Sequence, residues 1–412
     1  MTARRPWLSN LAAAVVSVTL CLGAIELVLQ IAYRVRHDIA RRAELQRYEA
    51  DYAASSEAYE DPSDYYGKWD TNPAIDYNTY LGYISRASRS GNGYRTNVHH
   101  ARYFEDFPAA KPPGEARVLV AGGSTAWGQG VRQEQLFTEL AERRFRHAGS
   151  NVRVVSMGVT AYSSTQERIL VENIAAGLDP DVMVLFSGFN DAYFGYSGKD
   201  ILREQDFFKF RQVLARKFPD VAPPPGQPDI YPPEFDEYVS KLRYFVDVRL
   251  FALRNRDRSR VEAVVRRQSL PVERVLQTLQ LNLETLADLA RRRGFRLVFM
   301  LQPSLYSTTK ALSPYERRML AVAEERYVGY ADYDRRFYTA CRKELPAHAE
   351  RLGYVFVDGD GAFAQESASV FIDHVHFGSR GNRLLGDFLH GVARDLLPKG
   401  RGREASRLPG GG

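Results

Sequence analysis

The chain has 412 residues, of which 44% are hydrophobic and 12% aromatic, and its 56 Lys and Arg exceed its 50 Asp and Glu by a net charge of +6. This composition predicts one large globular domain with appended segments. Interspersed charges and the lack of a nucleic-acid-binding motif argue against DNA or RNA as a partner. The only cysteines are Cys21 and Cys341, so no disulfide framework is expected, and no zinc-ligand pattern is present.

Residues 1–10 form a short basic N-terminus, and an apolar run follows at residues 11–33 with Glu26 as its only charged residue. The run is long enough to cross a hydrocarbon core of about 30 Å. We predict a single transmembrane anchor rather than a cleaved signal peptide, because the run exceeds a signal's apolar region and no small-residue cleavage site follows it. Arginines flank both ends, and the charge count alone would keep the following domain inside.

Residues 34–115 are predicted to connect the anchor to the domain. A charged helix is expected up to about residue 60, and a Tyr-, Pro- and Gly-rich segment with short strands at most is expected after it. The pattern then becomes regular, with apolar strands at 117–121, 152–157 and 182–187 and helices near 134–147 and 163–176. This alternation predicts a parallel sheet covered by helices on both faces.

Residues 195–270 interrupt the alternation and are interpreted as an insertion over the sheet. Their arginine-rich part is expected to be a solvated helix, with binding to anionic lipid as the alternative. The alternation resumes with helices at 272–292, around 314–343 and at 379–396, and with strands at 295–301 and 354–358. The globular domain is therefore placed at 116–397 and a disordered tail at 398–412.

The stretch VLVAGGSTAWGQG, residues 118–130, forms a glycine-rich turn between a strand and a helix. Such a turn can bind phosphate. Its letters match neither the P-loop nor the dinucleotide fingerprint, and no acidic residue follows the second strand to hold a ribose. Taken alone, the turn would be an ordinary helix N-cap. The downstream residues favour a third interpretation, in which it presents Ser124 as a nucleophile.

Three successive strand ends supply Ser124, Gly158 and Asn190, and the carboxyl ends of parallel strands meet at one edge of a sheet. We expect Ser124 to attack a carbonyl carbon. Its own N–H, the N–H of Gly158 and the side-chain amide of Asn190 are expected to bind the oxyanion. A side chain at Gly158 is expected to crowd the substrate.

The stretch FIDHVHFGSRG supplies a base for the serine. His376 would accept the Ser124 proton, while Asp373 would orient the imidazole and stabilise its charged form. The nearby His374 is expected to point elsewhere. No metal or cofactor is expected.

Two further stretches lie at strand ends. Asp191 is expected to tie together the turn after the third strand. The stretch QPSLY, residues 302–306, is expected along the substrate, without a catalytic part for Ser304 or Tyr306.

Together these blocks resemble the SGNH hydrolases, the GDSL-type esterases and lipases. The matching blocks, in family order, are GGST around Ser124, SMGVTAYSS around Gly158, SGFNDAY with Gly188, Asn190 and Asp191, and DHVH ending in His376. The resemblance implies a flavodoxin-like three-layer α/β/α fold, with Ser124, Gly158, Asn190 and His376 as the four family residues and Asp373 completing the triad. It covers about residues 117–396 outside the insertion. Gly123 departs from the family, which usually has a turn-supporting aspartate there.

The resemblance implies a serine esterase that acts through an acyl-Ser124 intermediate on acyl esters, O-acetyl esters included. With the predicted anchor, it is expected to be membrane-anchored and, by analogy, to act on envelope carbohydrate. An O-acyltransferase with the same triad and a non-catalytic envelope assembly protein with the same fold are the alternatives. By analogy with anchored envelope enzymes, the domain is expected outside the cytoplasm, in the periplasm or at the cell surface. The sequence indicates no oligomeric state.

Overall fold

The computed structural model describes residues 14–32, 55–61, 73–91, 93–198, 246 and 269–398. The chain divides into two units: residues 1–52 with 223–264, and residues 53–222 with 265–412. Most of the expected juxtamembrane helix, most of the insertion and nearly all of the C-terminal tail lie outside the described residues.

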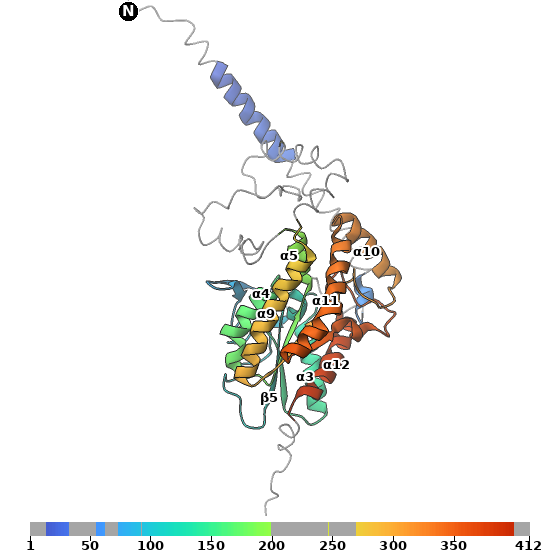
Figure 1. Ribbon diagram of the computed structural model, residues 1–412. Helices are drawn as coiled ribbons and strands as arrows, with labels where there is room; N and C mark the ends of the chain where they lie inside the picture. Colours follow the sequence, from blue (N-terminus) through green and yellow to red (C-terminus); the bar gives the residue numbers. More distant parts are fainter. Residues whose placement is uncertain are drawn as a thin grey trace, which may run out of the picture. The chain divides into compact units, whose positions relative to one another are not determined.

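In the first unit, Ala14–Ala32 forms a helix of 19 residues with a mean hydropathy of 2.1 (Figure 1). Its one charged residue, Glu26, accepts a hydrogen bond from Gln30 one turn further on, at 3.1 Å. The helix is long and apolar enough to cross a membrane, and a signal sequence would share both properties.

In the second unit, a central sheet of five parallel strands has the order β6-β5-β7-β8-β9 among the described residues. The strands are β5 (Ala116–Gly122), β6 (Val152–Ser156), β7 (Val182–Ser187), β8 (Arg296–Leu301) and β9 (Val355–Asp358). The five predicted strands are confirmed. The connection after β5 runs to β6 on one side and the connection after β7 runs to β8 on the other, so the strand order reverses between β5 and β7. This is where open α/β sheets place their ligands.

Helices cover both faces of the sheet, as predicted (Figure 1). One face carries α3 (Phe137–His147) and α12 (Ser379–Leu396), which pack against each other. Alternate β5 residues, Val118 and Val120, join their buried apolar core. The other face carries α4 (Ser164–Asn173), α5 (Phe189–Tyr196), α9 (Val272–Arg293) and α11 (Tyr330–Leu352). The three-layer α/β/α fold is therefore confirmed.

The prediction of a single helix around 314–343 is wrong, because this stretch lies in two helices. The first, α10, spans Pro314–Arg326 and begins with a capping box between Ser313 and Glu316. Gly329 then adopts φ +81°, a left-handed conformation that interrupts the helix, and α11 begins at the next residue. The second helix continues past Pro346 to Leu352.

In the described part of the approach segment, the strands are all short, as expected. A hairpin pairs β1 (Ile75–Asn78) with β2 (Gly82–Ser85), and a smaller one pairs β3 (Ser90–Gly91) with β4 (Tyr94–Arg95). Before them, the turn η1 (Ser56–Ala58) precedes Tyr59, which is buried and donates its hydroxyl to the Gly130 carbonyl at 2.5 Å. These segments are thus packed on the domain.

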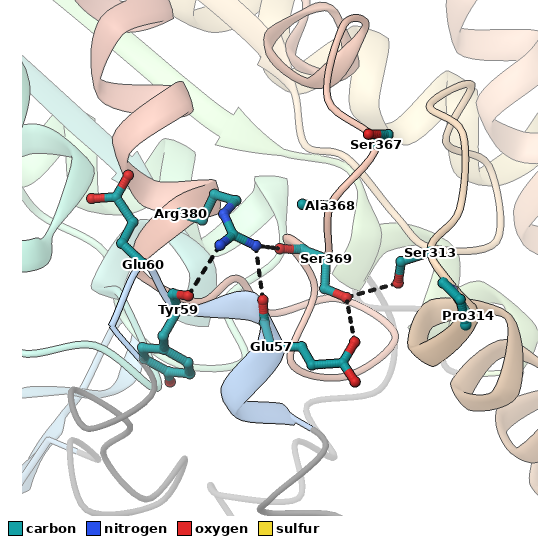
Figure 2. Close-up of a pocket in the computed structure, with 9 residues that line it drawn as sticks. All are labelled: Glu57, Tyr59, Glu60, Ser313, Pro314, Ser367, Ala368, Ser369 and Arg380. Atoms are coloured by element: carbon teal, nitrogen blue, oxygen red, sulfur yellow. Dashed lines mark hydrogen bonds between the residues drawn. The ribbon is translucent and has the colours of Figure 1, made fainter.

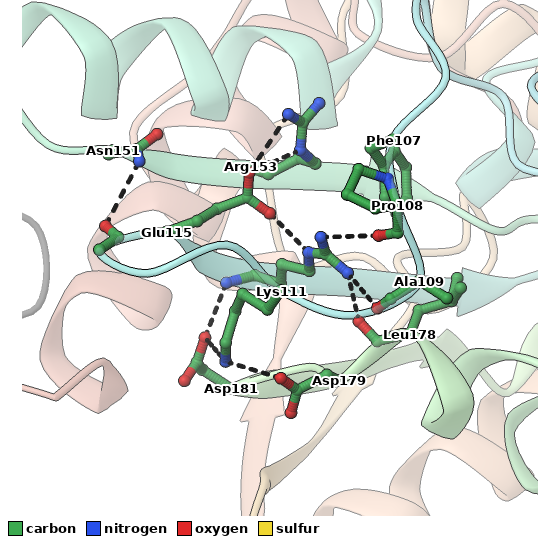
Figure 3. A network of polar contacts seen from close by, with 12 residues as sticks. Phe107, Pro108, Ala109, Lys111, Glu115, Asn151, Arg153, Leu178, Asp179 and Asp181 are labelled. Atoms are coloured by element: carbon green, nitrogen blue, oxygen red, sulfur yellow. Dashed lines mark hydrogen bonds and ion pairs between the residues drawn. The ribbon is translucent and has the colours of Figure 1, made fainter.

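A buried polar network stabilises the amino-terminal edge of the sheet (Figure 3). Arg117 is fully buried and donates to Glu115 Oε1 at 2.6 Å. Its guanidinium also donates to three backbone carbonyls, those of Pro108, Ala109 and Leu178. Asp181 Oδ2 accepts from Lys111 Nζ at 2.7 Å and from the backbone N–H of Arg117 at 2.8 Å. Because every one of these groups has a partner, this edge serves the stability of the fold.

The two ends of the expected insertion meet on the domain. The N–H of Leu270 donates to the Gly195 carbonyl at 2.8 Å, and the Ser269 hydroxyl donates to the Tyr196 carbonyl at 2.8 Å. The chain therefore leaves and rejoins the α/β fold at one place, as an insertion requires.

Candidate active site

The serine lies at the start of a four-residue helix, α2 (Ser124–Trp127), directly after β5. Two glycines allow this sharp turn. A Cβ at Gly122 would collide with the Phe186 carbonyl, and one at Gly123 would lie 2.6 Å from Asn190 Nδ2. The turn therefore brings the residues that follow β5 and β7 close together.

Ser124, His376 and Asp373 form a continuous series of hydrogen bonds. The Ser124 hydroxyl lies 2.7 Å from His376 Nε2, and His376 Nδ1 lies 2.8 Å from Asp373 Oδ2. With an acceptor carboxylate at Nδ1, the ring carries its proton there, and Nε2 accepts the hydrogen bond of the serine hydroxyl. The three residues predicted from the sequence as a triad are thus in contact.

A tight loop between β9 and α12 holds the histidine and the aspartate. Phe371 and Phe377 pair across its base, and the N–H of Ile372 donates to the His376 carbonyl at 2.9 Å. Ser124 is half-buried, whereas His376 is only 7% exposed. Solvent and a ligand can therefore reach the hydroxyl while the protein encloses the ring.

Asn190 lies in the first turn of α5, beside the residue that precedes Ser124. Its Nδ2 donates to the Tyr162 carbonyl at 2.6 Å. An amide nitrogen carries two hydrogens, so this bond fixes the side-chain orientation and leaves one hydrogen for a ligand.

Gly158 lies against the α2 backbone, and the structure corrects the reason for a glycine at this position. A Cβ there would collide with the backbone of Ala126 and Trp127, so the obstacle is the helix that begins at Ser124. The Gly158 N–H donates a long hydrogen bond to Ser156 Oγ at 3.3 Å, and that hydroxyl donates to the Ala126 carbonyl at 2.6 Å. The Gly158 loop and α2 therefore form one packed unit.

A buried arginine from the approach segment holds the end of α2. Arg102 donates to the carbonyls of Trp127, Gly128 and Val131 at 2.7, 2.8 and 2.7 Å. Burial lowers the pKa of its guanidinium to about 9, so it stays charged at neutral pH. A positive charge at a helix C-terminus is favourable. Sequence reasoning missed Arg102, because a lone arginine in an irregular segment carries no recognisable pattern.

Asp191 has a wider role than the predicted turn. Its Oδ1 accepts from the Ser164 hydroxyl at 2.5 Å and its Oδ2 from the Ser164 N–H at 3.1 Å, which connects α5 to the start of α4. Burial raises the pKa of Asp191 to about 6. Burial and the Asp191 charge also raise the pKa of the neighbouring Glu167 well above its usual range. The buried carboxyl group of Asp191 thus joins two helices next to the site, and Glu167 lies buried beside it.

The other histidine of the block, His374, belongs to an aromatic cluster. Its ring lies 5.7 Å from Phe189, 5.7 Å from Tyr306 and 5.5 Å from Tyr327. His374 is half-buried and Tyr306 is 4% exposed. The ring of His374 therefore packs among aromatic side chains and takes no part in the hydrogen bonds that join Ser124, His376 and Asp373.

Ser304 is buried and donates to Asp334 of α11 at 3.2 Å. All five residues of the stretch 302–306 are buried, and its expected place along the substrate stays a prediction.

A pocket of about 380 Å³ opens elsewhere on the domain (Figure 2). Its walls come from η1 and the residues after it, the first residues of α10, the 367–369 loop and Arg380. Arg380 donates to the Glu57 carbonyl at 2.8 Å and the Ser369 carbonyl at 3.2 Å, so its guanidinium is used in joining these segments. None of the three triad residues lines this pocket.

A three-layer α/β/α fold with a serine, a histidine and an aspartate joined at the carboxyl edge of its sheet is the architecture of a serine hydrolase. Residues 120–384 match the GDSL-like Lipase/Acylhydrolase family, and the chain belongs to this family. The resemblance found in the sequence is confirmed, and the protein is a GDSL-type hydrolase.

Several solved structures are similar to this chain. TesA has 14% identity and a TM-score of 0.37, over 68% of this chain and 99% of its own. A GDSL-like lipase from Bacteroides thetaiotaomicron VPI-5482 has 12% identity and a TM-score of 0.34, over 68% and 89%. Axe2, an acetylxylan esterase from Geobacillus stearothermophilus, has 13% identity and a TM-score of 0.33, over 69% and 97%. No curated protein matches the sequence. These distant similarities say nothing about the substrate of this chain.

Proposed function

We propose that this protein is a membrane-anchored serine esterase that hydrolyses acyl esters, O-acetyl esters included, through an acyl-Ser124 intermediate. The observation that best supports this function is the series of hydrogen bonds from Ser124 through His376 to Asp373, at 2.7 and 2.8 Å. A hydroxyl, an imidazole and a carboxylate in this order form the arrangement that activates a serine.

In the proposed reaction, Ser124 Oγ attacks the ester carbonyl carbon as His376 Nε2 takes its proton. The carbonyl π electrons move to oxygen, and the N–H groups of Ser124 and Gly158 with the second amide hydrogen of Asn190 stabilise this oxyanion. When the intermediate collapses, the C–O bond to the alcohol breaks and His376 returns the proton to the leaving oxygen. Water then attacks the acyl-serine with His376 again as base, which releases the acid and restores Ser124.

The proposed substrate is an acyl ester of a carbohydrate in the cell envelope. Its support is an aromatic cluster next to the triad in sequence: the ring of His374, which follows Asp373, lies 5.7 Å from Phe189, which precedes Asn190, and 5.5 Å from Tyr327. A pyranose ring presents C–H groups on its faces, and concave sites of this kind combine aromatic walls with few polar groups. The apolar helix at residues 14–32 supports anchoring. The hydrolase domain is proposed on the outer side of the membrane by analogy with anchored envelope enzymes.

The test is labelling of the full chain in detergent with a fluorophosphonate, together with hydrolysis of 4-nitrophenyl acetate. Wild type is expected to be labelled and active, Ser124→Ala to lose both properties, and Ser90→Ala, at an exposed serine, to keep both. An unlabelled wild type would instead support a non-catalytic assembly role. Adding an oligosaccharide separates hydrolysis from O-acyl transfer, because acetyl groups recovered on the sugar, in place of free acetate, would identify a transferase.

A further inference from the structure

We infer that Tyr83, on the hairpin that precedes the hydrolase fold, is a positioning residue for the oxyanion donors. Together with Tyr162 it forms a pair, called here the tyrosine clasp, that fixes the loop at residues 158–162. This inference rests on the proposed function, because it assigns the loop a role in binding the oxyanion.

The clasp consists of two reciprocal hydrogen bonds. The Tyr83 hydroxyl donates to the Thr160 carbonyl at 2.8 Å, and the Tyr162 hydroxyl donates back to the Tyr83 carbonyl. Both side chains are fully buried, and their ring centroids lie 5.4 Å apart in an edge-to-face arrangement. A third bond, from Gln166 Nε2 to the Leu81 carbonyl at 3.0 Å, joins the same hairpin to the start of α4. The hairpin therefore holds both ends of the Thr160–Tyr162 turn.

The turn needs this external support. Ala161 adopts φ +64°, a left-handed conformation that a residue with a Cβ disfavours. Such a conformation persists only where the surrounding contacts fix it. The Tyr83 hydroxyl holds the Thr160 carbonyl, and Tyr162 is held through its own hydroxyl on the Tyr83 carbonyl. The clasp therefore fixes the residues on either side of Ala161.

The turn connects directly to both proposed donors outside α2. The Tyr162 carbonyl accepts Asn190 Nδ2 at 2.6 Å, so the position of this carbonyl decides where the second amide hydrogen points. Gly158, at the beginning of the same loop, lies against the α2 backbone. A shift of the loop would therefore move both donors relative to the serine, and small misplacements of such groups are costly in rate.

The experiment compares Tyr83→Phe and Tyr162→Phe with Tyr103→Phe in the full chain. Tyr103 is the matched control, because it is also buried and its hydroxyl is bonded, to Glu142 at 2.9 Å and to Arg153. Arg153 lies near the start of β6, whereas Ser124 follows the end of β5, so this control acts at the opposite edge of the sheet. On 4-nitrophenyl acetate, we expect kcat to fall about tenfold in both clasp variants with KM nearly unchanged, since the interaction concerns the transition state. Thermal stability should fall by a similar amount in all three variants. A kcat loss of the same size in Tyr103→Phe, or none in the clasp variants, would overturn the inference.

A double-mutant cycle tests whether Tyr83 acts through Asn190. In an Asn190→Ala background, Tyr83→Phe should cost clearly less than it does in wild type, because one of the groups that it positions is gone. If the fold losses in kcat of the two single variants simply multiply in the double variant, Tyr83 does not act through Asn190.

Amide hydrogen exchange gives a result that does not depend on turnover. The backbone amides of residues 158–162 should exchange faster in Tyr83→Phe than in wild type, and their exchange rates should be unchanged in Tyr103→Phe. Unaltered exchange in Tyr83→Phe would refute the clasp even if the enzyme is an esterase. Faster exchange in a protein without Ser124 labelling would keep the clasp and reject the proposed function.

Discussion

The carboxylate of Asp373 contacts His376 at two points, accepting ring Nδ1 with Oδ2 at 2.8 Å and the backbone N–H with Oδ1 at 2.7 Å. Oδ1 also accepts the N–H of Val375 at 2.8 Å. One oxygen thus shapes the loop and the other orients the ring. Position and protonation of the imidazole therefore depend on the same side chain.

Asp373→Asn should lower kcat by about a thousandfold or more. An amide can supply an acceptor to the loop or to the ring but not to both, and an NH2 group facing Nδ1 favours the tautomer that cannot take the serine proton. The measurement is steady-state hydrolysis of 4-nitrophenyl acetate, with a melting curve to verify folding. Asp387→Asn, which removes an exposed ion pair with Arg144, serves as control and should keep full activity. Near-normal turnover in Asp373→Asn would contradict the proposed triad.

Gly123→Asp, which introduces the residue usual in the family, should reduce activity in this chain. The new Cβ would lie 2.6 Å from Asn190 Nδ2, so the amide must move away from its place beside Ser124. We expect kcat to fall about tenfold. Stability should change little, because the end of a side chain gives way more easily than backbone. The measurement compares kcat and the melting temperature of the variant with those of wild type. A rise in kcat would show that Asn190 can accommodate the new side chain without leaving its place beside Ser124.

Arg102→Lys should lower the free energy of unfolding by about 2–4 kcal/mol. A lysine cannot reproduce the fork that reaches the carbonyls of Trp127, Gly128 and Val131, and buried carbonyls without donors are costly. Urea denaturation measures the change. Arg86→Lys alters an exposed pair with Asp76 and should leave the midpoint almost unchanged. Equal midpoints for the two variants would mean that Arg102 contributes no more than a surface arginine.

Asp334 should make the protein less stable as the pH rises from about 4 to about 7. Burial raises its pKa in the folded state to about 7, whereas an unfolded chain releases this proton near pH 4. In this window the folded state binds the extra proton, so the free energy of unfolding falls with pH by about 1.4 kcal/mol per unit from this group, with no further loss above pH 7. Asp334→Asn should lose less stability than wild type between pH 5 and pH 8 in urea denaturation. Parallel behaviour of the two proteins would exclude this titration.

Most of the fold could be predicted because its signals are local. Buried parallel strands are short apolar runs, and all five are visible in the sequence. The break between α10 and α11 was missed because a single glycine within a helical pattern does not by itself predict a helix end. In the structure, Gly329 adopts a φ of +81°, which separates the two helices.

The proposed triad could be predicted because serine, histidine and aspartate are the residue types that the chemistry requires. The roles of Arg102 and Tyr83 could not be predicted, because both side chains donate to backbone carbonyls. A carbonyl exists at every position, so no sequence pattern marks these contacts. The role of Gly158 was misassigned for a similar reason. Its neighbour is the backbone of Trp127, and only the folded arrangement brings the two together.

Ser124 and His376 are 252 residues apart in the chain, and the loop with His376 immediately precedes α12, which packs beside α3. During synthesis, the strand and turn that present the hydroxyl emerge long before its imidazole does. In the proposed mechanism, a nascent or truncated polypeptide ending before residue 376 has a serine without its proton acceptor. Its esterase activity should therefore stay low until the loop with His376 and the helix after it have been made.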